Sequence, residues 1–157
     1  MSKQHNYELS ILWTGNKGTG TSAYAAYERS HTVQTTNKIE IPCSSDPSFR
    51  GDSTKYNPEE LLVASLSACH MLTYLHQCAI AGIVVTAYTD KATGLMEETP
   101  EGGGRFLEVT LNPVVTITDA TMKDQAMMFH QKAEELCFIA NSVNFPVRHR
   151  PVVETIR

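Results

Sequence analysis

The longest patterned run of apolar residues lies in the middle of the chain, from Asn57 to Gly82. Three signals predict a helix that starts here, because Asn57 can act as the N-cap, Pro58 suits the first helical position and Glu60 completes a capping box. A helix of about 24 residues is roughly 36 Å long. Its apolar side chains surround most of its circumference: Leu61, Leu62, Val63, Leu66, Ala68, Met71, Leu72, Leu75 and Ile80. A helix that is apolar nearly all round must be covered on most sides, so we expect a partner subunit to cover it.

The segments before this helix have the composition of strands. Tyr7 to Trp13 alternates apolar and polar residues, and residues 21–29 and 32–41 are rich in Tyr, Thr, Val and Ile. These three segments predict an antiparallel N-terminal sheet. Residues 42–56, in which Pro, Ser, Asp and Gly dominate, are predicted to form a loop.

The chain after Gly82 predicts more strands and a second helix. Asp119 can cap a helix over residues 120–141, in which apolar residues recur at spacings of three and four. The predicted strands cover residues 83–89, residues 105–118 with a break at Asn112 and Pro113, and residues 147–156, with a hairpin turn at Gly102–Gly104. Because the strands come in antiparallel runs around two helices, we expect an α+β fold.

Length and charge narrow the class of protein. The 157 residues contain no repeat or linker, so we expect a single domain over residues 1–157. The net charge of −4 leaves no basic face for nucleic acid. The chain has neither a long uninterrupted apolar stretch nor a signal-like N-terminus, so we expect a cytoplasmic protein that does not enter a membrane.

The four cysteines are the residues best suited to take part in a chemical reaction. Cys43, Cys69, Cys78 and Cys137 form no CxxC pair, and the six histidines form no HExxH or HxH motif, so no metal site is expected. Cys69 lies in a polar break of the first helix, and Cys137 is predicted to lie on the second helix, so both could face one seam between helices. Free cysteines are more often inert and buried than reactive. The pattern alone leaves both interpretations open.

Three separated motifs carry a resemblance to a known family. They are Asn57–Leu61 (NPEEL), Ala64–Cys69 (ASLSAC) and Glu134–Cys137 (EELC) followed by Ala140 and Asn141. Together they resemble the osmotically inducible protein C and organic hydroperoxide resistance (OsmC/Ohr) family, and the chain is most similar to its OsmC-like branch. The predicted order of strands and helices is similar too, so the resemblance covers essentially the whole chain. It implies the OsmC-like fold and an intertwined homodimer.

The resemblance also implies a thiol peroxidase that reduces organic hydroperoxides to alcohols. Cys69 corresponds to the peroxidatic cysteine, Cys137 to the resolving cysteine, and Glu59 to the acid that holds a catalytic arginine. Arg50 matches the arginine position of OsmC proteins, and Arg29 is the alternative arginine. The chain departs from the Ohr pattern at Phe138, where Ohr proteins have a proline, and at His70, where the family often has an aromatic residue.

The implied chemistry needs a Cys69 thiolate, because the anion is the nucleophile. A guanidinium beside the sulfur would favour the thiolate and polarise the O–O bond. Attack leaves a Cys69 sulfenic acid, which Cys137 would condense with to give a Cys69–Cys137 disulfide. No bound cofactor is expected, and an external dithiol, of the lipoyl type in the family, would reduce the disulfide. Four side chains could line an apolar mouth for the hydroperoxide, although core packing is the commoner reason for such residues: Met71, Leu72, Met127 and Phe138.

Helix geometry constrains the role of Glu59. Ten residues along a straight helix place Glu59 about 15 Å from Cys69. If both serve one site, Glu59 must come from the other subunit or the helix must break.

Two alternatives to the peroxidase remain. One is a non-enzymatic dimer that binds a hydrophobic small molecule between its long helices and in which the cysteines are structural. The other is a hydrolase that uses Cys69 with His130 or His76 as the base.

Overall fold

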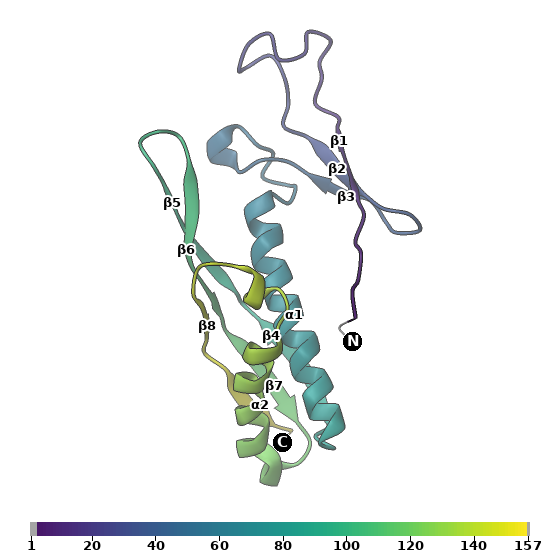
Figure 1. The fold of residues 1–157 in the computed structure, drawn as a ribbon, viewed down its shortest axis with the longest axis vertical. Helices are drawn as coiled ribbons and strands as arrows, with labels where there is room; N and C mark the ends of the chain where they lie inside the picture. Colours follow the sequence, from purple (N-terminus) through teal and green to yellow (C-terminus); the bar gives the residue numbers. More distant parts are fainter. Residues whose placement is uncertain (1–2, 157) are drawn as a thin grey trace. The chain divides into compact units, whose positions relative to one another are not determined.

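The chain forms two compact units, which Figure 1 shows in a computed structural model that describes residues 3–156. The first unit ends at Leu61, and the second begins at Leu62. The boundary falls in the first turn of the long helix α1 (Pro58–Ile80). Each unit has β-sheet structure of its own and is described separately below.

The first unit contains the predicted antiparallel N-terminal sheet. Its strand order is β1 (Ser10–Trp13), β2 (His31–Gln34) and β3 (Ile41–Cys43). The expectation of a strand over residues 21–29 is wrong, because this segment consists of turns and bends. The Arg29 guanidinium donates to the backbone carbonyls of Tyr24 and Tyr27, which curls the segment inward. These side-chain contacts within the segment override the strand propensity of its Tyr and Thr residues.

The start and end of α1 confirm the sequence signals. Asn57 Oδ1 accepts a hydrogen bond from the Glu60 backbone N–H at 2.8 Å, and Glu60 Oε2 accepts one from the Asn57 N–H at 3.1 Å. This reciprocal pair is the predicted capping box. Gly82, with φ of 73°, follows the helix in the left-handed conformation that glycine tolerates best.

The second unit contains two three-stranded sheets with the orders β4-β7-β9 and β5-β6-β8. Their strands are β4 (Val85–Asp90), β5 (Thr93–Glu98), β6 (Gly104–Leu111), β7 (Pro113–Ile117), β8 (Val147–His149) and β9 (Val152–Thr155). The break at Asn112 was predicted, whereas β5 was not. The expected α+β fold is confirmed, and the expected antiparallel pairing is present between β4 and β7 and between β5 and β6, whereas β8 runs parallel to β6 and β9 runs parallel to β7. The intervening helix returns the chain in the same direction, which parallel pairing requires.

The second helix, α2 (Lys123–Leu136), is shorter than predicted. Asp119 caps the short 3₁₀ helix η2 (Ala120–Met122) that precedes it, and Asp119 Oδ1 accepts a hydrogen bond from the Thr121 N–H at 2.8 Å. The expectation that Cys137 lies on this helix is wrong, because Cys137 has an extended backbone (φ −70°, ψ 111°) directly after its end. A second 3₁₀ turn, η3 (Ala140–Ser142), then leads to β8.

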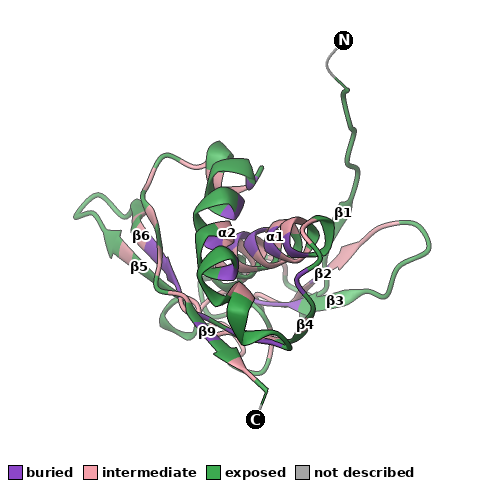
Figure 2. Cartoon of the chain, turned by 90° about the horizontal axis from the view of Figure 1, so that it is seen from below, coloured by how far each residue is buried: buried purple, intermediate pink, exposed green. Residues whose placement is uncertain are grey.

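The core of the second unit has two clusters of buried side chains. One joins α1, α2 and the β4-β7-β9 sheet around Tyr74 and Val115, and the other lies around Leu66, Val109 and Leu111. Figure 2 shows the buried positions of α1 and α2 as purple bands. The same helix α1 leaves Leu72 63% and Ile80 71% exposed within one copy of the chain. Among residues 3–156, no helix has the length and apolarity needed to cross a bilayer.

Candidate functional site

The two predicted redox cysteines meet inside the second unit. Cys69 is half-buried on α1, and Cys137 is buried directly after α2. The Cys137 Sγ accepts a hydrogen bond from the Ala140 backbone N–H at 3.4 Å. Burial and the adjacent Cys69 thiol raise the pKa of Cys137 to about 11. The structure therefore brings together two thiols that are 68 residues apart in the sequence.

The difference between the two thiols is chemically useful. A Cys137 with so high a pKa stays protonated near neutrality, so it is a poor nucleophile towards an external substrate. Cys69 is the more accessible of the two. The arrangement suits Cys69 for reaction with a substrate, and Cys137 for a second step at the Cys69 sulfur.

The other two cysteines lie in structural surroundings. Cys43 is buried at the end of β3, and Cys78 is buried beside Tyr74 in the core of the second unit. Burial raises the pKa of both thiols. Cys78 is on the same helix as Cys69 but nine residues further along, about 13 Å in rise.

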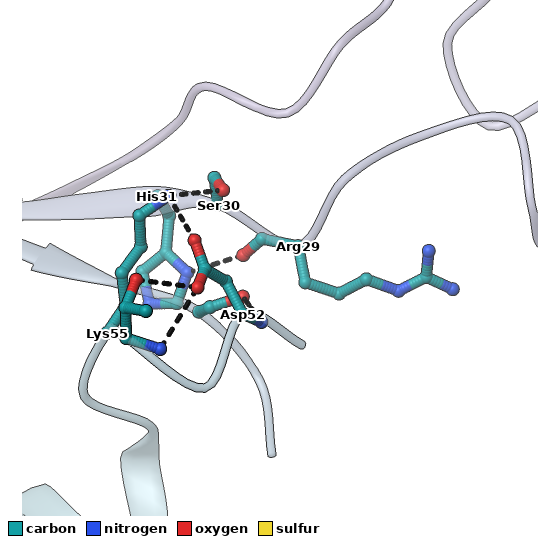
Figure 3. Close-up of polar contacts among 7 residues, drawn as sticks. Arg29, Ser30, His31, Asp52 and Lys55 are labelled. Atoms are coloured by element: carbon teal, nitrogen blue, oxygen red, sulfur yellow. Dashed lines mark hydrogen bonds and ion pairs between the residues drawn. The ribbon is translucent and has the colours of Figure 1, made fainter. Parts of the chain in front are cut away.

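The two candidate arginines differ in their surroundings. The Arg29 guanidinium lies between two aromatic rings, with its Cζ 4.3 Å from the centroid of Tyr24 and 4.2 Å from that of Tyr27. It also donates to the Tyr27 carbonyl at 2.7 Å and to the Tyr24 carbonyl at 2.8 Å. Figure 3 shows this side chain pointing away from the nearby Asp52 and Lys55. Arg29 therefore holds its own loop together.

Arg50 lies on an exposed turn, and its side chain makes fewer contacts than that of Arg29. It ends the 3₁₀ helix η1 (Pro47–Phe49) in a left-handed conformation, with φ of 64°. Its Cζ lies 5.8 Å from the Tyr24 ring centroid, and its guanidinium makes no hydrogen bond with the described residues. This leaves the donors of Arg50 open to a ligand or a partner.

A polar cluster anchors the segment that follows Arg50 to the N-terminal sheet (Figure 3). Lys55 Nζ lies 3.1 Å from Asp52 Oδ2 and donates to Ser30 Oγ at 2.9 Å. The hydrogen bonds from Thr54 and the Lys55 ammonium lower the pKa of Asp52 to about 2, so its carboxylate stays charged. The cluster fixes the end of the loop from which Arg50 projects.

Glu59, the predicted partner of the catalytic arginine, is half-buried in the first turn of α1. Among residues 3–156 it forms no ion pair, with Arg50 or with any other residue. The predicted arginine–carboxylate pair is therefore not made within one chain in this structure.

The four residues predicted to line a substrate mouth lie mainly at the surface of one copy. Leu72 and Phe138 are 63% and 80% exposed, Met127 is exposed as well, and Met71 is half-buried. Their role in binding a hydroperoxide stays a prediction.

Sequence reasoning missed a group of three histidines, one of which, His70, directly follows Cys69 in the sequence. His70, His130 and His149 come from α1, α2 and β8, and the rings of His70 and His130 are stacked. Burial lowers the pKa of His70 to about 3 and that of His130 to about 4. The available signal was His70 itself, which shares one helix face with Leu66 and Tyr74. In the described part of the chain, no group of three or more His, Cys, Asp or Glu side chains is arranged to hold a metal ion.

Fold and site define an α+β protein with a pair of adjacent thiols, one in the middle of α1 and the other directly after α2. The family model described as OsmC-like protein matches residues 51–151. The chain belongs to this OsmC family. Comparison with curated protein sequences gives no match.

Solved structures agree with this assignment. An OsmC-like protein of unknown function from Vibrio cholerae is 29% identical with a TM-score of 0.85, and the match covers 95% of this chain and 100% of that one. An organic hydroperoxide resistance protein from Elizabethkingia anophelis is 21% identical with a TM-score of 0.66, covering 98% and 100%. An organic hydroperoxide resistance protein OsmC from Legionella pneumophila, described as a predicted redox protein, is 21% identical with a TM-score of 0.65, covering 96% and 99%. The last two similarities concern the fold.

Proposed function

We propose that this protein is a thiol-dependent peroxidase that reduces organic hydroperoxides to alcohols. The observation that carries the proposal is the position of Cys69 beside Cys137, of which the first is partly accessible and the second is buried and protonated. Membership of the OsmC family supports it, as do the organic hydroperoxide resistance proteins of similar fold.

The proposed reaction has three steps. The Cys69 thiolate attacks one peroxide oxygen, the O–O bond breaks, and the leaving alkoxide takes up a proton and departs as the alcohol, so that Cys69 becomes a sulfenic acid. Cys137 then attacks the Cys69 sulfur and water leaves, which produces the Cys69–Cys137 disulfide. An external dithiol, possessing two thiols that can close to a disulfide of its own, returns both cysteines to thiols by exchange.

Arg50 is the proposed activating cation. Its unengaged guanidinium can stabilise the thiolate and donate to the peroxide oxygens, whereas the Arg29 guanidinium is held between Tyr24 and Tyr27. Glu59 would orient that arginine as a positioning residue.

The proposed assembly is a homodimer in which the sites are shared. The helix α1 is uninterrupted from Pro58 to Ile80, so the ten residues between Glu59 and Cys69 correspond to about 15 Å of rise. This removes the alternative of a broken helix. Glu59 can therefore act beside a Cys69 only if that cysteine belongs to the other subunit, whose presence would also cover the exposed Leu72 and Ile80.

Peroxide turnover tests the proposed function directly. The purified protein is mixed with cumene hydroperoxide or t-butyl hydroperoxide and with either dihydrolipoamide, another dithiol or a monothiol. We expect catalytic production of the alcohol with a dithiol, because the second thiol completes exchange within the mixed disulfide. A protein that binds the hydroperoxide without turnover under all of these conditions would instead be a small-molecule-binding member of the family.

Substitution of the two arginines should separate their roles. We expect Arg50→Ala to lower kcat/KM for the hydroperoxide by about a hundredfold, the usual scale for the loss of a donor to a developing anion. Arg29→Ala should mainly lower the thermal stability of the first unit, because the contacts of Arg29 are with its own loop. The reverse result, with activity lost in a stably folded Arg29→Ala protein and kept in Arg50→Ala, would assign the cation role to Arg29.

A further inference from the structure

Three histidines from three elements of the second unit meet in its interior. His70 Nε2 and His130 Nδ1 lie 3.1 Å apart, within a hydrogen bond, and their ring centroids are 5.4 Å apart. The ring of His149 lies 4.4 Å from that of His70. His70 is fully buried, His130 is 2% exposed, and the side chain of His149 is 8% exposed. We call these three residues the histidine cluster.

The surroundings of His70 and His130 contain few groups that could stabilise a positive charge on either ring. His70 Nδ1 and His130 Nε2 are buried and make no hydrogen bond with the described residues. The face of His130 packs on the ring of Tyr74 at 3.9 Å between centroids. A proton added to either ring would produce a desolvated cation beside other imidazoles, which is strongly unfavourable.

The nearby carboxylates, Glu134 and Asp90, favour a proton on His149 but not on His70 or His130. The Glu134 carboxylate of α2 lies 3.3 Å from His149 Nδ1, where it can pair with that ring alone, and its side chain is half exposed. The Asp90 carboxylate of β4 accepts hydrogen bonds from Ser67 Oγ at 2.5 Å and from the Asn112 N–H at 2.7 Å. Two neutral phenols complete the surroundings of His130: Tyr74 of α1, on which the ring of His130 stacks, and Tyr88 of β4, whose ring lies 6.1 Å from that of Tyr74.

We propose that the histidine cluster is an acid-sensitive lock, which holds α1, α2 and β8 together while its rings are neutral and releases them when a ring takes up a proton. The elements joined by the lock are those that bring Cys69 and Cys137 side by side. The lock concerns the packing of the second unit and does not depend on peroxidase activity.

The expected direction of the pH effect follows from proton uptake. Burial lowers the pKa of His70 to about 3 and that of His130 to about 4, and the pKa of His149 is lowered as well. In the unfolded chain a histidine has a pKa of about 6.5, so below that pH the unfolded state binds protons that the folded state does not. Stability is therefore complete above about pH 6.5 and falls as the pH decreases towards the folded values.

The histidines should change the unfolding equilibrium constant by a defined factor within a defined pH range. Each neutral buried histidine raises the unfolding equilibrium constant by about tenfold for every pH unit below about 6. His70 and His130 together give about a hundredfold for each unit. Carboxylates with lowered pKa values, namely Glu28, Asp46, Asp52 and Asp119, lose their contribution at lower pH, below about 4.5. Measurements above about pH 5 isolate the histidines.

Urea unfolding of the full chain at several pH values between about 7.5 and 5 tests the lock. The variants are His70→Gln and His130→Gln, with His76→Gln, an exposed histidine of the same helix α1, as the matched control. For each pH unit of acidification, the unfolding constant of each buried variant should rise about tenfold less than that of the wild type. The control should keep the wild-type dependence. A wild-type dependence in both buried variants would overturn the proposal.

A second measurement needs no variant and therefore does not depend on whether the variants fold. Histidine ring exchange with deuterium, followed by mass spectrometry of peptides, reports the pKa of each imidazole in the folded wild-type protein. Peptides with His70 and His130 should show no titration between about pH 7.5 and 5. Titration of His70 and His130 near pH 6.5 in the folded state would exclude the lock.

Discussion

Replacing Cys69 by Ser is expected to abolish peroxide reduction, lowering the rate by roughly three orders of magnitude or more. The serine hydroxyl has a far higher pKa than a thiol, so it cannot provide the anion that attacks the peroxide oxygen. The remaining cysteines cannot replace it, because Cys137 is buried with a pKa of about 11, and Cys43 and Cys78 are buried elsewhere. The measurement is the consumption of cumene hydroperoxide with a dithiol present.

Cys78→Ser is the matched control for this variant, because it makes the same substitution on the same helix. Cys78 packs in the core beside Tyr74, so its replacement should lower stability and leave the rate per folded molecule near wild type. Peroxide consumption at the wild-type rate by Cys69→Ser would remove the proposed mechanism, whatever the behaviour of the control.

Mixing two impaired proteins is expected to restore activity if Glu59 acts beside the Cys69 of the other subunit. A heterodimer of Cys69→Ser and Glu59→Ala chains contains one site with both lesions and one site with neither. A statistical mixture should therefore recover about a quarter of wild-type activity, provided that the two sites act independently. Co-expression with two different affinity tags makes the heterodimer available for direct assay.

The control for this experiment pairs Cys69→Ser with Cys137→Ser. Both cysteines meet within one chain, so each site of that heterodimer lacks one of its two thiols. It should not recover turnover, which shows that recovery in the first pair requires residues from different subunits. No recovery in a verified Cys69→Ser and Glu59→Ala heterodimer would mean that Glu59 has no shared role at the thiol.

Local rules predicted the parts of the fold that local interactions determine. The capping box of Asn57 and Glu60, the cap at Asp119 and the strand break at Asn112 each depend on a few neighbouring residues, and each is present. The prediction for residues 21–29 failed because the contacts of Arg29 with Tyr24 and Tyr27 override the strand propensity of the segment.

The sequence patterns did not predict which strands pair when they are far apart in the chain. The parallel pairing of β8 with β6 and of β9 with β7 joins segments that no local signal connects. The histidine cluster was not predicted for the same reason, since His70, His130 and His149 are spread over three elements and form no short motif. The adjacency of Cys69 and Cys137 was expected from a seam between helices, whereas Cys137 lies just beyond the end of α2.

Mapping the oxidised cysteines after one equivalent of hydroperoxide shows whether Cys69 and Cys137 are the redox pair of this protein. The protein is treated with cumene hydroperoxide, blocked with an alkylating reagent and digested without reduction, and the peptides are identified by mass spectrometry. We expect one peptide pair linked through Cys69 and Cys137, in a protein that migrates as a single chain on a non-reducing gel, and in Cys137→Ser a sulfenic or sulfinic acid at Cys69. Reduced and alkylated Cys69 after treatment, or a disulfide that leaves Cys69 out, would contradict it.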